Sequence, residues 1–164
     1  MIEELAKKKT ILSADVQSFI RVNDNGKLVS KEWPERNDIF ACLDILKTDA
    51  VEAGLLFGNC DLYTAAHKMH DLGPKEVIIT HREGLLVFAD GNFYEEKFFP
   101  KEIIGRSGRG DTCIASYTAK RLSAPPQEAT TWAAAVTSLK METEGPFQRT
   151  IKEVNDLIQS KYRR

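Results

Sequence analysis

Short apolar runs suited to buried strands alternate along this chain with segments in which apolar residues recur at helical spacing. The clearest run covers residues 77–80, Val-Ile-Ile-Thr, a β-branched stretch typical of a strand covered on both faces. The preceding residues 62–69 place apolar side chains at i, i+3, i+4 and i+7, the spacing of one helical face. Because strands separated by helices pack as layers, this order predicts a three-layer α/β fold with a mostly parallel sheet.

An antiparallel hairpin is expected to make that sheet mixed. Residues 85–88 and 93–98 are strand-like and flank Asp90-Gly91, a dipeptide that readily adopts the positive φ angles of a tight turn. Two shorter strands are expected at residues 10–14 and 45–46, and helices are expected to begin near Gly110 and Pro126. A last helix is expected over residues 151–158.

Composition excludes several classes of protein. The 164 residues suit a single domain, residues 1–164. The 23 basic and 24 acidic residues nearly balance, which argues against a general nucleic-acid binder. No run of about 18 apolar residues suggests a membrane span, and the acidic start does not resemble a signal peptide. The three cysteines lack CxxC spacing, which indicates reduced thiols and a cytoplasmic protein.

The glycine-rich segment of residues 105–112, Gly-Arg-Ser-Gly-Arg-Gly-Asp-Thr, carries the chemical signal. Glycine permits turns closed to other residues and leaves room for a ligand to approach the main chain. A helix that begins there presents unpaired N–H groups and the positive end of its dipole. The segment therefore predicts an anion site suited to phosphate.

Asp111 has two explanations at this stage. Its carboxylate suits a helix cap, or it acts as a general base that takes a proton from an attacking hydroxyl while the backbone holds a transferring phosphoryl group. Two other phosphate motifs are excluded, because no Gly-Lys-Ser or Gly-Lys-Thr of a P-loop is present and the glycine order is G-x-x-G-x-G.

Residues 108–112, Gly-Arg-Gly-Asp-Thr, resemble the G-A-G-D-[TS] signature of the ribokinase-like (PfkB) carbohydrate kinases. An alanine-rich helix at residues 133–138 and Gly145-Pro146 follow at the matching distances. Residues 46–52 resemble the family's L-K-P-N-x-x-E segment, and residues 11–15 resemble a mid-chain strand that ends in aspartate. The resemblance spans about residues 10–160, and the glycine segment is also similar to that of a subgroup of inositol kinases.

The resemblance implies ATP-dependent phosphoryl transfer to a hydroxyl of a sugar, polyol or nucleoside, with Mg²⁺. Asp111 would be the base, and the amides of Gly108, Arg109 and Gly110 would form an anion hole. Asp49 and Glu52 would organise magnesium indirectly. The nucleotide would lie near the following residues: Thr80, His81, Arg106, Ala134 and Thr137.

The sequence departs from the family pattern at four single positions, and its loop at residues 81–84 is shorter than the family's T-x-G-x-x-G segment and lacks the first glycine. Arg109 replaces an alanine, Asp49 an asparagine, Gly105 an aspartate, and Ala134 the asparagine of the alanine-rich helix. Arg106 and Arg109 are expected to offset lost contacts by pairing with phosphates.

Length is the larger departure, because members of this family are about twice as long. Their N-terminal half supplies the sugar-binding residues and a lid that excludes water. We therefore expect this chain to be the nucleotide-and-base half, with the lid and N-terminal half absent, and inactive alone. Self-association or pairing with the missing half would cover its exposed sheet edge. The alternative is a non-catalytic half-domain that binds a nucleotide or a partner.

Overall fold

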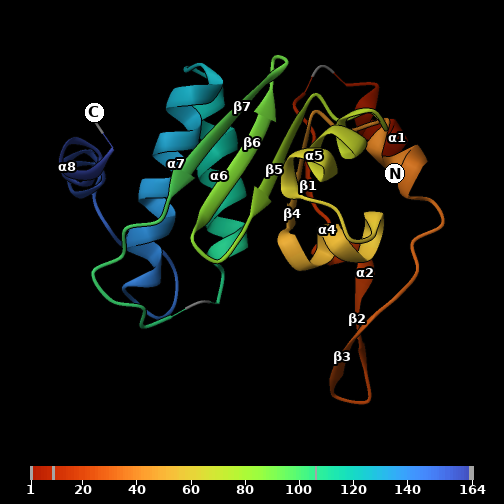
Figure 1. Cartoon of the computed structure of the whole chain (residues 1–164), viewed down its shortest axis with the longest axis horizontal. Coiled ribbons are helices and arrows are strands. Elements are labelled where there is room, and N and C mark those ends of the chain that lie inside the picture. The colour runs from red at the N-terminus through yellow and green to blue at the C-terminus, as the bar shows by residue number, and fades with distance from the viewer. Residues whose placement is uncertain (1, 9, 106, 163–164) are drawn as a thin grey trace.

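A five-stranded sheet forms the centre of the molecule, as the computed structural model shows for residues 2–8, 10–105 and 107–162 (Figure 1). The strand order is β1-β4-β5-β6-β7. The first three are parallel, and β6 and β7 join as antiparallel neighbours. The strands are β1 (Ser13–Asp15), β4 (Ile45–Asp49), β5 (Glu76–Thr80), β6 (Gly84–Ala89) and β7 (Asn92–Lys97).

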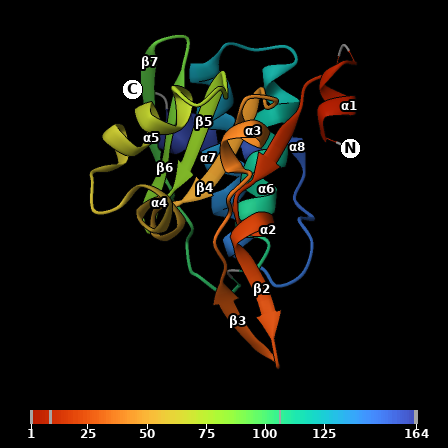
Figure 2. The ribbon, with the colours of Figure 1, turned by 90° about the vertical axis from the view of Figure 1, so that its right-hand side faces the viewer.

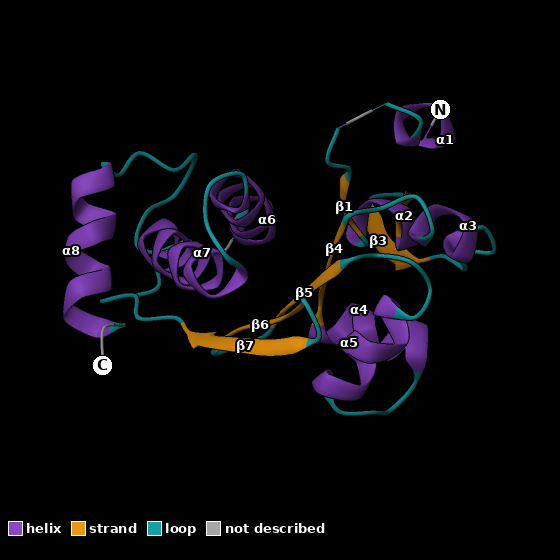
Figure 3. Ribbon diagram, turned by 90° about the horizontal axis from the view of Figure 1, so that it is seen from above, coloured by secondary structure: helices purple, strands orange, loops and turns teal. Residues whose placement is uncertain are grey.

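Helices cover both faces of this sheet, which confirms the predicted three-layer α/β arrangement (Figure 3). Helices α4 and α5 lie on one face, α6 and α7 lie on the other, and α8 packs outside α7. The helices are α1 (Ile2–Ala6), α2 (Gln17–Ile20), α3 (Arg36–Phe40), α4 (Ala50–Phe57), α5 (Leu62–His70), α6 (Arg109–Arg121), α7 (Pro126–Met141) and α8 (Ile151–Lys161).

Strand β5 is buried on both faces because its side chains alternate between two cores. Val77 and Ile79 join the core on the α4–α5 side. Ile78 points the other way and joins the core of α6 and α7, which also contains Tyr117. The two-sided burial that the β-branched run predicted is therefore confirmed.

The structure contains two hairpin turns, of which the sequence analysis predicted one. Asp90 and Gly91 adopt φ values of 50° and 72°, so the predicted β6–β7 turn is confirmed. A second hairpin, β2 (Arg21–Asp24) and β3 (Lys27–Ser30), projects from the body and was not predicted (Figure 2). Its turn is Asn25-Gly26, with φ values of 50° and 82°, which is a strong hairpin signal.

The first strand is shorter than predicted. It covers only Ser13–Asp15 rather than residues 10–14, and Ile11 is 43% exposed. Among the strands of the described residues, β4 is the one that pairs with β1. In the described part of the chain, we find no helix with the length and apolar character that crossing a membrane requires.

A buried ion cluster fastens α6 to the beginning of β5. Arg121 donates from Nη2 to Glu76 Oε1 over 2.7 Å and from Nε to the same carboxylate. The Tyr117 hydroxyl donates to Glu76 Oε2 over 2.6 Å. Burial, reinforced by the Glu76 carboxylate, raises the pKa of Tyr117, so the phenol stays protonated and remains a donor.

We expect Glu76→Gln to lower the free energy of unfolding by about 2 kcal/mol, because the guanidinium of Arg121 loses its charged acceptor. Denaturant unfolding measures this change. Lys152→Ala is the control, since it breaks the exposed Lys152–Asp156 pair and should leave the stability unchanged. Equal stability of Glu76→Gln and the wild type would show that the cluster contributes nothing net.

Candidate active site at the start of helix α6

The start of α6 faces the carboxyl ends of β1, β4 and β5. In open α/β sheets, ligands bind at this edge, where strand ends and helix starts converge. A pocket of about 360 Å³ lies here. It is lined by Gln17, Lys47, Asp49, Thr80, Ser107, Gly108, Arg109, Gly110 and Asp111.

The backbone of this pocket has the features that the predicted anion site requires. Gly108 is the N-cap of α6 and adopts φ 73°, a left-handed conformation that favours glycine. The amides of Gly108, Arg109 and Gly110 donate to no acceptor in the part of the chain that the structure describes. These three N–H groups, without an acceptor among residues 2–8, 10–105 and 107–162, lie at the positive end of a 13-residue helix and suit a phosphate.

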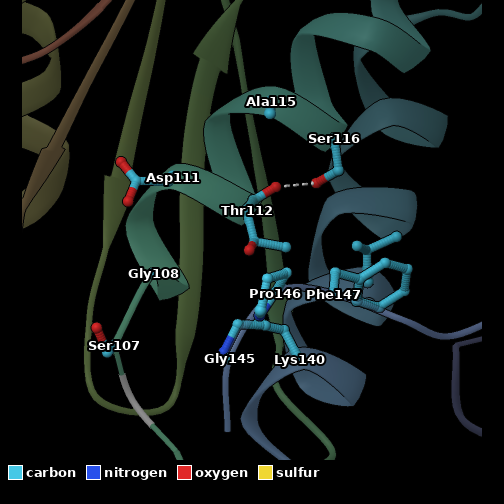
Figure 4. Close-up of a pocket in the computed structure, with 11 residues that line it drawn as sticks. Ser107, Gly108, Asp111, Thr112, Ala115, Ser116, Lys140, Gly145, Pro146 and Phe147 are labelled. Carbon is cyan, nitrogen blue, oxygen red and sulfur yellow. Dashed lines mark hydrogen bonds between the residues drawn. The ribbon is translucent and has the colours of Figure 1, made fainter. Parts of the chain in front are cut away.

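Asp111 is exposed and occupies the third position of α6. It forms no hydrogen bond or ion pair with any described residue. Because Gly108 rather than Asp111 is the N-cap, the capping explanation is wrong for this residue. Figure 4 shows Asp111 and Ser107 on one side of this turn, with Thr112 and Pro146 on the other. The unpaired carboxylate is therefore available to a ligand at the free amides.

A buried ion pair lies directly beneath Gly110. Lys47 Nζ donates to Asp15 Oδ2 over 2.7 Å, and the two side chains are 3% and 12% exposed. A Cβ atom at Gly110 would stand 2.5 Å from Lys47 Nζ and 3.4 Å from Asp15 Oδ2. Gly110 therefore allows α6 to approach the pair closely. Lys47 and Asp15 lie in segments that carry the family resemblance, but no role was predicted for either.

Asp49 and Glu52 form a capping box at the start of α4. Asp49 Oδ1 accepts from the Glu52 amide over 2.8 Å, and Glu52 Oε2 accepts from the Asp49 amide over 2.9 Å. Arg21 Nη2 lies 3.3 Å from Asp49 Oδ2 and 3.1 Å from Glu52 Oε1. Burial raises the pKa of Glu52. The pair therefore holds a guanidinium next to the pocket, an arrangement that could not be inferred from spacing alone.

Magnesium fits this pocket only with the help of a ligand's phosphates. Glu52 is fully buried and does not line the pocket, whereas Asp49 does. No group of three metal-binding side chains exists among the described residues. Mg²⁺ is commonly held by one or two carboxylates together with substrate phosphates. Asp49 and bound phosphates would suffice, with Glu52 acting indirectly through the capping box.

The predicted nucleotide contacts are only partly brought together. Thr80 lines the pocket, and its hydroxyl donates to the Thr48 carbonyl over 3.4 Å. His81 lies next to it, and burial lowers the pKa of its imidazole, so the ring is neutral at pH 7. Ala134 and Thr137 are fully buried in α7, and neither lines this pocket. A nucleotide would touch them only if the core opened. Arg106 lies outside the described residues.

A second pocket, of about 580 Å³, shares the same turn of α6 (Figure 4). Ser107, Gly108 and Asp111 line both pockets. The far walls of the second pocket come from α6, α7 and the loop before α8, and they consist of Thr112, Ala115, Ser116, Val136, Lys140, Gly145, Pro146 and Phe147. This pocket was not predicted, because residues far apart in the sequence form it.

The pfkB family carbohydrate kinase model matches residues 9–151, and the chain belongs to this family. Its structure is similar to that of a pyrophosphate-dependent kinase in the ribokinase family, solved with a pyrophosphate analogue and myo-inositol, at 39% identity and a TM-score of 0.85. That match covers 94% of this chain and 56% of the other. A pyrophosphate-dependent myo-inositol-1 kinase converted into a myo-inositol-3 kinase matches at 39% identity and a TM-score of 0.86, covering 98% and 58%.

A ribokinase from Thermotoga maritima shares the fold at 20% identity and a TM-score of 0.76, covering 95% of this chain and 52% of that one. This chain therefore spans little more than half the length of the relatives that it matches. A search among curated protein sequences finds no significant match.

We expect Gly110→Ala to destabilise the protein by about 1–3 kcal/mol, because the new methyl group must push Lys47 away from Asp15. Gly54→Ala is the matched control, since Gly54 lies inside α4 with open space around its Cβ position. That change should stabilise by about 0.5–1 kcal/mol. Thermal unfolding compares the two, and an unaltered stability of Gly110→Ala would mean that Lys47 moves aside freely.

The three cysteines are expected to differ in reactivity. Cys113 is completely buried, and burial raises the pKa of its thiol to about 11, whereas Cys42 and Cys60 are partly exposed. At pH 8, iodoacetamide should alkylate Cys42 and Cys60 in the folded protein and leave Cys113 unmodified. Peptide mass spectrometry gives the result. Alkylation of Cys113 at a similar rate would contradict its buried position.

Proposed function

We propose that this chain carries the donor-binding and proton-accepting part of a kinase that transfers a phosphoryl group to a hydroxyl of a cyclic polyol. One observation carries the proposal. The unpaired carboxylate of Asp111 lies in the same turn as the free amides of Gly108, Arg109 and Gly110. Such a turn can hold an anion and accept a proton at neighbouring points, which phosphoryl transfer to an alcohol requires.

In the proposed reaction, the three amides hold the phosphoryl group that is transferred. Asp111 accepts the proton of the attacking hydroxyl as the new O–P bond forms, and the rest of the donor leaves with the electron pair of the broken P–O bond. Arg109 adds positive charge around the pocket, whereas the charge of the buried Lys47 is balanced by Asp15. The amides are fixed by the helix, so they need not reorganise as charge develops on the phosphoryl oxygens.

We propose pyrophosphate as the donor. The two solved relatives at 39% identity are pyrophosphate-dependent kinases, and the first holds myo-inositol with a pyrophosphate analogue. The burial of Ala134 and Thr137 also supports a donor without a base, because both residues predicted to lie near a nucleotide are inside the core. Mg²⁺ bound to the donor would neutralise phosphate charge, and Asp49, which lines the pocket, would supply a carboxylate to it.

ATP is the second candidate donor. A ribokinase from Arabidopsis thaliana, solved with ribose and ATP, matches at 25% identity and a TM-score of 0.67, covering 75% of this chain and 43% of that one. The other alternative is a half-domain that binds a nucleotide or a partner without catalysis. A titration and a transfer assay distinguish both alternatives from the main proposal.

Isothermal titration of the chain with Mg²⁺-pyrophosphate and Mg²⁺-ATP should show binding, with pyrophosphate preferred. Asp111→Asn should retain pyrophosphate binding, because it leaves the amides in place. In the complete kinase, which also supplies the acceptor-binding half, the same substitution should reduce transfer from labelled pyrophosphate to myo-inositol by about 10²–10⁴-fold, because the base is lost. Asp156→Asn, on the exposed face of α8, is the matched control and should change neither quantity.

Each outcome of this titration and assay decides between the alternatives. Absence of pyrophosphate binding at millimolar concentration would contradict the donor site. A preference for ATP would replace pyrophosphate as the donor. Pyrophosphate binding by this chain, with transfer by the complete protein that Asp111→Asn leaves unchanged, would favour the non-catalytic half-domain.

A further inference from the structure

Lys140 is a buried cation with no acidic partner. It lies in the last turn of α7 and is only 3% exposed. Its ammonium donates to the Thr143 carbonyl over 3.4 Å, a long hydrogen bond. No carboxylate of the described residues lies within ion-pair distance. Burying a charge without a counter-charge costs folding free energy, so a structural or functional reason is expected for the burial of this side chain.

Lys140 lies next to the start of α6, and this position suggests a reason for its burial. Lys140 Cε lies 3.8 Å from the point where a Cβ of Gly108 would stand, which places the side chain against the N-cap of α6. It also lines the second pocket, where Figure 4 draws it together with Gly145 and Pro146. The ammonium is therefore next to the turn that carries the free amides of the anion site.

The residues that follow α7 contact Gly105 next to this lysine. Thr143, whose carbonyl accepts from Lys140, approaches Gly105 so closely that a Cβ at Gly105 would stand 2.8 Å from that carbonyl oxygen. The Gly105 amide also donates to the Met141 carbonyl over 3.1 Å. The ammonium is thus held in a narrow, formed environment rather than on a free surface.

A purely structural role explains this arrangement less well. A cation in the last turn of a helix interacts favourably with the helix dipole. An exposed lysine would gain the same interaction without losing its hydration, however. The burial of Lys140 is explained if an anion binds at the neighbouring turn. The positive start of α6 and the ammonium then share one negative partner, and their attraction to it is strong in a medium of low polarity.

Resting on the proposed function, we propose that Lys140 is a donor-binding residue, whose buried ammonium balances the charge of the phosphate held at the start of α6. The unliganded protein then carries an uncompensated charge that donor binding neutralises. The proposal therefore predicts two opposite effects. Removal of the charge should weaken pyrophosphate binding, but it should not lower the stability of the unliganded protein.

The test uses Lys140→Met and Lys140→Gln in this chain, with inorganic pyrophosphate as the ligand. We expect the dissociation constant for pyrophosphate to rise by about 10–100-fold in both variants, because a charge-assisted contact is lost. The melting temperature without ligand should stay unchanged or rise. Lys120→Met is the matched control. Lys120 lies in the last turn of α6, where it packs over Trp132, and its loss should leave pyrophosphate binding unchanged.

The outcomes separate this inference from the function on which it rests. Wild-type affinity in both variants would overturn the role of Lys140 and leave the donor site intact. A lower melting temperature, or failure to fold, in both variants would show a structural lysine and would also overturn it. Absence of pyrophosphate binding to the wild type would contradict the proposed function itself.

Discussion

The close approach of α6 to the carboxyl ends of β1 and β4 determines the rest of the site. The buried Lys47–Asp15 pair joins the two strand ends, and Gly110 lets the helix begin directly above it. Every other feature depends on this contact, because it fixes where the free amides point and where Asp111 emerges. A helix displaced by one side chain would present its amides to a different part of the pocket.

Some of the positive groups around this contact are paired with carboxylates, and others are not. Lys47 is neutralised by Asp15, and Arg21 is held by the capping box of Asp49 and Glu52. The free amides and Lys140 have no such partners among the described residues. Of the paired groups, Lys47 and Asp49 line the pocket. The amides and the ammonium of Lys140, in contrast, leave donors at the start of α6 without an acidic partner among the described residues, beside the unpaired carboxylate of Asp111. An anion can satisfy these donors.

What the sequence predicts well here is local. The β-branched run of β5, the Asp90-Gly91 turn and the glycine-rich start of α6 each follow from a few neighbouring residues, and each is found in the structure. The same kind of signal was present at Asn25-Gly26 and predicts the β2–β3 hairpin once it is considered.

The features that could not be predicted are contacts between distant segments. The Lys47–Asp15 pair joins residues 32 positions apart, and Lys140 reaches Gly108 from another helix. The family resemblance also implied that Ala134 and Thr137 lie near a nucleotide, whereas the packing of α6 on α7 buries both. Helical periodicity shows which residues share a face, but not which neighbour covers that face.

The missing Cβ at Gly110 has an evolutionary consequence. Any side chain at position 110 would overlap the ammonium at position 47, so the two positions are bound by one steric and electrostatic condition. Homologues that lose the lysine are released from the requirement for glycine, and homologues that keep it are not. Positions 47 and 110 should therefore covary across the family, although 63 residues of chain separate them.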